Sequence, residues 1–391
     1  MTNKVNNSNT NTDSAKNVLV YAISNRSGGG YSVLEDFFQD TVRLSKADNK
    51  IKWIYALSTQ QLCESQGVKI LNYPWVLGGL IHRLFFNVFI IKKLIKEYKI
   101  DYIVSLQNAS VVGARIPTII SFHNVLPLYK CDDKILDSGI LRIKQRILNK
   151  MIIRSVKNAR ATIIPGNWIK ERFVEDFGID RSRLYVSHFR LPKKEAEIKR
   201  DADLVDKLNV KILFFYPASA FPYKNHEVIV KACYELKKRG VTDYRVLFTI
   251  KPDGGRTAAV LFNDAKLLDG NIELCGPIQR DTVMDLYRNA VLLFPSKIEA
   301  DALPLIECKS VGGYMISSDL PFAREAIQDY QGALFFEPDD YMGLARMMEK
   351  IIKDGVPDYT VADNSMNEGD SRAEIVSSIV LGNEQFEDAV L

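Results

Sequence analysis

The chain has 391 residues, of which 47% are hydrophobic and 26% charged, and its formal net charge is +4. This composition is typical of a soluble globular protein with material for two domains, and so small a net charge does not indicate nucleic acid as a partner. The five cysteines are scattered without C-x-x-C spacing, which argues against a disulfide framework and a zinc site and favours the cytosol, and the longest apolar run, residues 84–91, is too short to span a bilayer.

The chain opens with a polar leader and continues as an α/β domain. Residues 1–16 are rich in Asn and Thr and lack an apolar segment, so we expect a disordered leader instead of a signal peptide. In residues 17–195, short apolar runs then alternate with helical patterns, which predicts a parallel sheet covered on both faces. The predicted strands are 17–23, 52–57, 68–73, 101–106, 117–122 and 160–165, and the predicted helices are 79–98, 140–157 and 168–177, with another beginning at Tyr31.

Two features of this first domain are candidate site elements. Gly29 and Gly30 lie in a Gly-rich turn, "RSGGG", directly after the first predicted strand. The turn does not match G-x-G-x-x-G, so by itself it fits a flexible strand-to-helix connection as well as a phosphate site. His123 comes at the carboxyl end of the strand at 117–122, where ligands bind in such sheets, although a lone His is more often structural.

The first domain also contains two basic helical segments. Residues 139–160 carry seven Lys or Arg and no acid, with Ile, Leu and Met at helical spacing. Residues 80–98 add four cations and one acid. This pattern favours docking on an anionic membrane surface, with an ordinary solvated basic face as the alternative.

The alternation of strands and helices restarts after a charged, strand-poor linker at residues 196–209. We therefore predict a second domain at 210–370 and a C-terminal helix and tail at 371–391, and hence two doubly wound Rossmann-like domains with a ligand in the cleft between them. The predicted strands of the second domain are 211–218, 244–250, 271–276, 290–296, 313–318 and 332–338, and its predicted helices are 226–239, 282–288, 304–310, 322–328 and 341–353, followed by 372–382 in the tail.

Two stretches of the second domain combine groups suited to a sugar nucleotide. Lys224 precedes a predicted helix at the end of the domain's first strand, a position suited to a diphosphate, although a solvated turn Lys is equally compatible. In "EADALPLIE", Pro304 is suited to the first turn of a helix, and Glu299 and Glu307 lie on either side of that helix start. The amides there can bind an anion and the carboxylates can accept from hydroxyl groups. The alternative is an exposed loop Glu and a first-turn Glu favoured by the helix dipole.

The second domain resembles the retaining, nucleotide-sugar-dependent glycosyltransferases of family four, which have the GT-B fold. The resemblance holds in order and spacing over about 140 residues. The matching residues are Pro295, Ser296, Glu299, Leu303, Pro304, Glu307, Gly312, Ser318 and Asp319.

The resemblance implies a role for each candidate residue. Glu307 would bind the ribose diol of the nucleotide, and Glu299 the hydroxyls of the donor hexose. The amides of Ala302 and Leu303 would hold the diphosphate, and Lys224 would stabilise it as the leaving group. The family also has a His at the position of His123, near the transferred sugar, and its Gly-rich loop faces the donor phosphates, which makes Gly29 and Gly30 candidates.

The chain departs from the family pattern at two places. Ala300 and Ala302 replace glycines and Asp301 replaces an aromatic residue, which puts the loop shape in question because alanine disfavours positive φ. Asp301 could reach toward the sugar or the acceptor. The family's phosphate-binding Arg is replaced by Ala218 and Ser219, and Arg280 could supply part of the lost charge.

The resemblance therefore predicts a hexosyltransferase that acts with retention on a lipid-linked glycan in surface-polysaccharide synthesis. We expect it in the cytoplasm, on the inner face of the membrane, without a cofactor or metal. The only Asp-x-Asp, at 201–203, lies in the linker and not at a strand end. The alternatives are a non-catalytic nucleotide-sugar-binding subunit, suggested by the missing Arg, and a GT-B epimerase or hydrolase. The sequence does not identify the sugar, the nucleotide or the acceptor.

Overall fold

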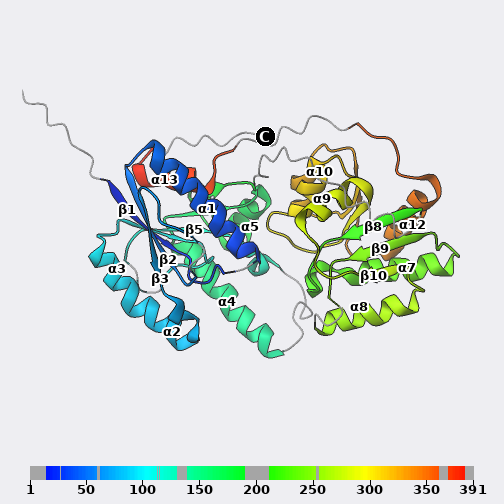
Figure 1. Cartoon of the computed structure of the whole chain (residues 1–391), viewed down its shortest axis with the longest axis horizontal. Coiled ribbons are helices and arrows are strands. Elements are labelled where there is room, and N and C mark those ends of the chain that lie inside the picture. Colours follow the sequence, from blue (N-terminus) through cyan, green and yellow to red (C-terminus); the bar gives the residue numbers. More distant parts are fainter. Residues whose placement is uncertain are drawn as a thin grey trace, which may run out of the picture.

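The protein folds into two α/β domains that lie side by side (Figure 1). The computed structural model describes residues 15–26, 28–59, 62–111, 113, 115–129, 139–189, 211–251, 255–360 and 369–383. The linker expected at 196–209, its Asp-x-Asp and nearly all of the expected leader lie outside the described residues.

The first domain is built on a seven-stranded parallel sheet with the strand order β3-β2-β1-β4-β5-β6-β7. Its strands are β1 Lys16–Tyr21, β2 Ile51–Leu57, β3 Val68–Asn72, β4 Tyr102–Ser105, β5 Thr118–Ser121, β6 Ala161–Ile164 and β7 Leu184–Val186. Its α-helices are α1 Gly28–Ala47, α2 Leu80–Phe85, α3 Ile91–Glu97, α4 Gly139–Asn158 and α5 Asn167–Phe177.

The second domain is built on a six-stranded parallel sheet with the order β10-β9-β8-β11-β12-β13. Its strands are β8 Ile212–Tyr216, β9 Tyr244–Phe248, β10 Ile272–Leu274, β11 Val291–Phe294, β12 Met315–Ser318 and β13 Ala333–Phe336. Its helices are the short η5 Pro222–Lys224 and then α7 His226–Lys238, α8 Arg256–Leu267, α9 Arg280–Asn289, α10 Leu303–Ser310, α11 Pro321–Ile327 and α12 Tyr341–Asp354.

Both sheets have the doubly wound topology, which confirms the predicted fold class. In each, the first strand in sequence is central and the strand order reverses beside it, at β1 and β4 and at β8 and β11. The central strands are apolar and buried, as parallel sheets covered by helices on both faces require. Loops that leave the strands at this reversal are the usual place for a ligand.

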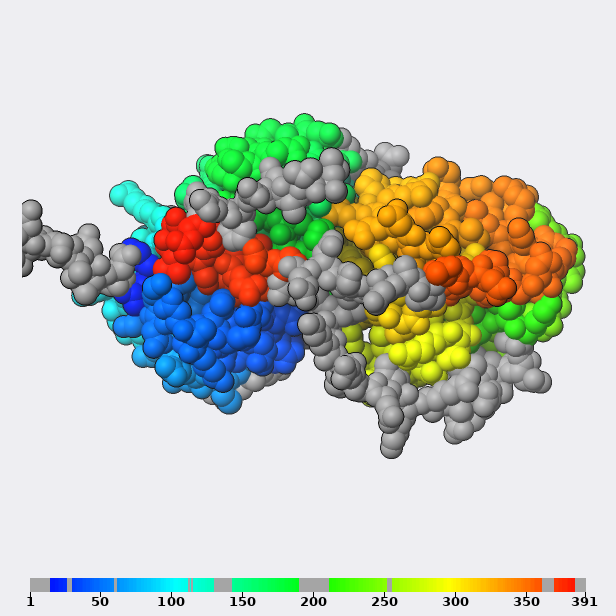
Figure 2. All heavy atoms as spheres, turned by 90° about the horizontal axis from the view of Figure 1, so that it is seen from above, coloured from blue at the N-terminus to red at the C-terminus, as the bar shows by residue number. Residues whose placement is uncertain are grey.

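The last described helix, α13 Arg372–Leu381, returns to the first domain. Figure 1 places α13 beside α1, whereas α12, which precedes it in sequence, lies at the far end of the second domain, and Figure 2 shows the same C-terminal segment against the N-terminal one. Its buried side chains join the core that contains Val18 and Phe37. They are Ala373, Ile375, Val376, Ile379 and Val380.

Several local predictions were wrong or incomplete. The helix expected at Tyr31 begins at Gly28, so the glycines of "RSGGG" lie in its first turn. The helix expected at 79–98 is present but contains a π-helical turn, η2 Phe86–Ile90, between α2 and α3. Strand β7 and helix α8 were not predicted.

Candidate active site at the domain boundary

Two loops at the carboxyl ends of β8 and β11 are joined to each other. The Lys297 amide donates to the Tyr223 carbonyl at 2.8 Å. The Tyr216 hydroxyl bonds to Ser296 Oγ at 2.8 Å and donates to the Lys224 carbonyl at 3.0 Å. The Pro-Ser of the sequence pattern therefore helps to fix the position of Lys224.

This joining brings together two of the sequence-predicted site residues. Lys224 Nζ lies 2.5 Å from Glu299 Oε1, and both side chains are largely buried. Lys224 also lies over the Tyr223 ring, 5.5 Å from its centroid. Lys224 supplies a cation that can bind a phosphate, and the Glu299 carboxylate can accept hydrogen bonds from the hydroxyl groups of a sugar.

The amides of Ala302 and Leu303 lie at the N-terminus of α10. Ala302 is the N-cap residue in a left-handed conformation, with φ of 46°, and Pro304 follows in the first turn. The loop thus keeps a positive φ although an alanine replaces the family's glycine. First-turn amides have no acceptor within a helix, so this end is suited to an anion.

Glu307 lies in the second turn of α10, which corrects the prediction of a first-turn position, because the helix begins at Leu303. Its carboxylate is 2.7 Å from Arg280 Nη2 and accepts a hydrogen bond of 3.3 Å from the Tyr287 hydroxyl. Burial raises the pKa of Glu307, and Arg280 opposes that shift. A favourable interaction with the helix dipole in the first turn therefore does not account for a Glu at position 307, whose carboxylate contacts Arg280 instead.

In the first domain, His123 is held in one orientation by Asn108 from the neighbouring strand end. Asn108 Oδ1 accepts from the amides of His123 and Asn124 at 2.6 and 2.8 Å. Its Nδ2, which can only donate, lies 3.1 Å from His123 Nε2. Burial, aided by the charge of Arg372, lowers the pKa of His123 to about 4. The ring is therefore neutral at pH 7 and carries its proton on Nδ1.

The glycines of the first domain belong to the first turn of α1, which lies after β1. Asn25 Nδ2 donates to the Gly30 carbonyl at 2.8 Å and to the Leu106 carbonyl at 3.1 Å. This side chain joins the start of α1 to the end of β4. Gly29 precedes Gly30 in the same turn.

Asp301 contacts a residue that the sequence analysis did not consider. Its Oδ1 lies 4.0 Å from Arg372 Nη2 at the start of α13. Burial raises the pKa of the Asp301 carboxyl, and Arg372 opposes that shift. Only the return of α13 to the first domain places Arg372 here, and no local sequence signal predicts that return.

The two domains meet through the loops that carry these residues. Ile298 and Ala300, after β11, pack in the apolar cluster of Phe122, the residue before His123. The Glu325 carboxylate of α11 accepts from the amides of Asn167 and Trp168 at 2.6 and 2.8 Å. The loop that carries Glu299 and the strand end that carries His123 therefore lie at the domain boundary.

Each domain of the chain matches a glycosyltransferase family model, and the whole chain resembles solved structures in fold. Residues 200–367 match the family model "Glycosyl transferases group 1", and residues 43–188 match "Glycosyltransferase Family 4". No curated protein matches the chain in sequence.

Among solved structures, HepE of Anabaena in complex with UDP-glucose has a TM-score of 0.62 at 13% identity, covering 94% of this chain and 96% of that one. WaaG, a glycosyltransferase involved in lipopolysaccharide biosynthesis, has a TM-score of 0.62 at 13% identity, covering 86% and 90%. Sucrose-phosphate synthase from Thermosynechococcus elongatus has a TM-score of 0.60 at 13% identity, covering 87% and 90%. At these identities the likeness establishes the GT-B fold.

Proposed function

Since its two domains match two glycosyltransferase family models, we propose that this chain transfers a hexose from a nucleoside diphosphate sugar to an acceptor hydroxyl with retention of configuration. The observation that carries the proposal is the contact between Lys224, which follows β8, and Glu299, which follows β11. It supplies a cation for the leaving diphosphate and an acceptor for sugar hydroxyls within one contact. The complex of HepE with UDP-glucose makes a UDP-sugar the first donor to test.

The remaining candidate residues contact different parts of the donor. In this proposal the amides of Ala302 and Leu303 bind the diphosphate, and Glu307 exchanges its contact with Arg280 for the ribose diol. Neutral His123, oriented by Asn108, lies near the transferred sugar. Gly29 and Gly30, at the start of α1, approach the phosphates from the first domain. No base is required from the protein, because the departing phosphate can take the acceptor proton, and we propose no metal or other cofactor.

We further propose that the acceptor is a lipid-linked glycan of surface-polysaccharide synthesis and that the first domain docks on an anionic membrane. The supporting observation is a row of exposed apolar side chains on α2 and η2. Leu80 and Ile81 are 84% and 82% exposed, and Leu84, Phe85 and Phe89 continue the row. Exposed lysines on α3 follow it: Lys92, Lys93 and Lys96. Apolar side chains beside cations fit the interface of an anionic bilayer.

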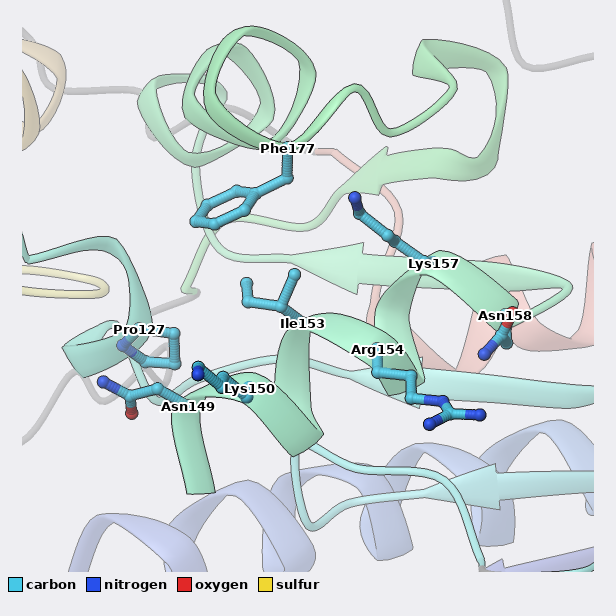
Figure 3. Close-up of a pocket in the computed structure, with 8 residues that line it drawn as sticks. All are labelled: Pro127, Asn149, Lys150, Ile153, Arg154, Lys157, Asn158 and Phe177. Carbon is cyan, nitrogen blue, oxygen red and sulfur yellow. The ribbon is translucent and has the colours of Figure 1, made fainter. Parts of the chain in front are cut away.

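Helix α4 repeats this combination along the same edge of the first domain, the lower one in Figure 1. Its exposed apolar residues Ile143, Ile147 and Met151 recur every four positions on one side of the helix. Lys150, Arg154 and Lys157 line a hollow of about 620 Å³, walled on the other side by Phe177 of α5 (Figure 3). An anionic headgroup could be bound there by these three cations.

Of the described helices, none combines the length and hydropathy needed to cross a bilayer. We propose that the protein binds peripherally, at the inner face of the cell membrane.

The donor proposal is tested by a thermal-shift screen with UDP-, GDP- and dTDP-hexoses, followed by an assay of nucleotide release with lipid-linked acceptors. We expect one nucleotide class to raise the melting temperature, because a ligand bound only by the native state stabilises it. Glu307→Ala should abolish that shift. Binding without release in the presence of a correct acceptor would favour a non-catalytic subunit, and release of free sugar would favour a hydrolase.

The membrane proposal is tested by co-sedimentation with vesicles of phosphatidylglycerol and phosphatidylcholine. We expect binding to the anionic vesicles only, with loss in Leu80→Asp/Ile81→Asp and in Lys150→Gln/Arg154→Gln/Lys157→Gln. A matched control replaces three exposed or half-exposed lysines of α7, Lys231, Lys237 and Lys238, by Gln. Equal loss in this control would show that only net charge matters and would overturn the docking surface.

A further inference from the structure

Arg372 and Asp301 form a polar pair across the domain boundary that the proposed donor contacts leave unexplained. Their side chains are only 9% and 14% exposed. The facing atoms, Nη2 and Oδ1, are 4.0 Å apart, which is too far for a hydrogen bond. Both atoms are buried and neither has a hydrogen-bond partner within the part of the chain that the structure describes. Buried charged groups are normally paired and hydrogen-bonded, so this pair is poised to bind something more.

Arg372 is held in place by the docking of α13. Ser371 and Glu374 form a capping box that fixes where the helix begins. The Glu374 carboxylate lies 2.8 Å from Arg43 of α1, and the Asp370 carbonyl accepts from Ser187 Oγ at 3.1 Å. The capping box and two contacts to the first domain therefore position the guanidinium before any ligand arrives.

Asp301 is held from the opposite side by the second domain. It is followed by Ala302, whose left-handed conformation and burial define the end of the loop. It is preceded by Ala300, which packs on the apolar cluster of the first domain. Glu299, two residues earlier, contacts Lys224. The gap between Arg372 and Asp301 thus adjoins the proposed position of the transferred sugar.

The spacing of the two atoms selects one kind of ligand group. An oxygen about 2.8 Å from each of two atoms fits between them when they are 4.0 Å apart. Arg372 can only donate, and a carboxylate at Asp301 can only accept. The bridging group must therefore accept one hydrogen bond and donate another, which a hydroxyl does and an ionised phosphate or carboxylate does not.

From this geometry we infer that Arg372 and Asp301 together bind one hydroxyl of a sugar, as a subsite that closes only when α13 is docked. This inference rests on the proposed function, since it assumes a sugar substrate. The hydroxyl belongs either to the transferred hexose or to the acceptor sugar, and the two sources are separable by experiment.

The experiment compares binding of UDP and UDP-glucose by titration calorimetry, or of the corresponding pair for the nucleotide that the screen selects. For a hydroxyl of the transferred hexose, Arg372→Gln and Asp301→Asn should each weaken binding of the sugar nucleotide about tenfold and leave UDP binding unchanged. If the hydroxyl belongs to the acceptor, the affinities for UDP and for UDP-glucose should both stay unchanged in these variants. An extract of lipid-linked glycans from membranes should then stimulate UDP release about tenfold less than it does with the wild type.

Two further variants distinguish binding from a structural role. Arg43→Gln removes a contact of α13 but leaves Arg372 and Asp301 unchanged. This variant should therefore lower the melting temperature and keep the ratio of the affinities for UDP and UDP-glucose. Arg372→Lys keeps the charge and should recover part of the lost affinity. Equal losses for UDP and UDP-glucose in Arg372→Gln, or no change in either assay, would overturn the inference. Failure of the wild-type protein to bind any sugar nucleotide would instead overturn the proposed function.

Discussion

At the scale of the residue, His226 makes the second domain sensitive to acid. Its ring is 2% exposed, lies 4.7 Å from the Tyr216 ring and 5.1 Å from the Phe248 ring, and has no hydrogen-bond partner among the described residues. Burial lowers its pKa to about 3. An unfolded His titrates near pH 6.5, so between that pH and about 3 the unfolded state binds the additional proton. Stability therefore falls as the pH falls below about 6.5.

We predict that His226→Phe flattens this pH dependence. The variant keeps an aromatic ring in the pocket and removes the titration, so the free energy of unfolding should lose about 1.4 kcal/mol less per pH unit between pH 6 and pH 4 than in the wild type. Melting temperatures across this range measure the difference. His82→Gln, at an exposed position, serves as the control. Parallel curves for the wild type and His226→Phe would contradict the prediction.

Ala302 tests how the loop before α10 tolerates the loss of a glycine. Its φ of 46° costs a non-glycine residue about 1–2 kcal/mol, whereas its methyl group, 2% exposed, contributes roughly 0.8 kcal/mol by burial. These effects nearly cancel, so Ala302→Gly should change the free energy of unfolding by less than about 1 kcal/mol and keep donor binding. Ala302→Val should destabilise by about 2 kcal/mol or more, because a branched side chain suits neither this φ nor the space.

Chemical denaturation and the donor thermal shift measure both Ala302 variants. A stable Ala302→Val protein with normal donor affinity would mean that the loop adopts another conformation in solution.

At the scale of the element, α13 is a component of the first domain's core. Five of its side chains pack with residues of α1 and β1, although its sequence lies beyond the second domain. We predict that Ile379→Ala, at a position 3% exposed, lowers the free energy of unfolding by about 2–5 kcal/mol. The half-buried Ser377→Ala serves as the control and should have little effect. An equally small effect of Ile379→Ala on the melting temperature would mean that α13 is not docked in solution.

Helices and strands were predicted well where a local sequence pattern alone determines them. Continuous apolar runs identified β1 and β11, and Pro304 located the start of α10 to within one residue. Local patterns failed where distant contacts decide. Three glycines read as a turn, but Asn25 joins the start of α1 to the β4 end, and the helix begins at Gly28.

The same distinction holds for the site. Lys224, Glu299 and His123 follow strand ends, and Glu307 lies in the helix that Pro304 opens, so local sequence patterns could identify all four as candidates. Arg372 could not be identified in this way, because its position depends on the packing of α13 against the first domain. The pairing of Glu307 with Arg280 was also beyond local patterns, since it needs the relative placement of α9 and α10.

At the scale of the whole molecule, the second domain completes a helix of the first. The N-cap residue of α5, Gly166, has no side chain to cap the helix, and Glu325 of α11 accepts from the next two amides instead. Trp168 also packs edge-on against Phe322, with ring centroids 6.2 Å apart. A Cβ at residue 166 would lie 3.1 Å from Glu325 Oε1, so the glycine allows the carboxylate to approach.

These contacts couple the orientation of the domains to the stability of α5. We predict that Glu325→Ala lowers the free energy of unfolding by about 1–2 kcal/mol, the usual effect of removing an N-cap acceptor, and increases the radius of gyration in X-ray scattering. Glu325→Gln keeps one acceptor oxygen and should fall between. Gly166→Ala should open the domains as well, because its methyl group displaces the carboxylate. The exposed Glu337→Gln is the matched charge control. If Glu325→Ala lost stability without any change in scattering, Glu325 would act as a helix cap alone, and the orientation of the domains would depend on the apolar contacts of Ile298 and Phe322.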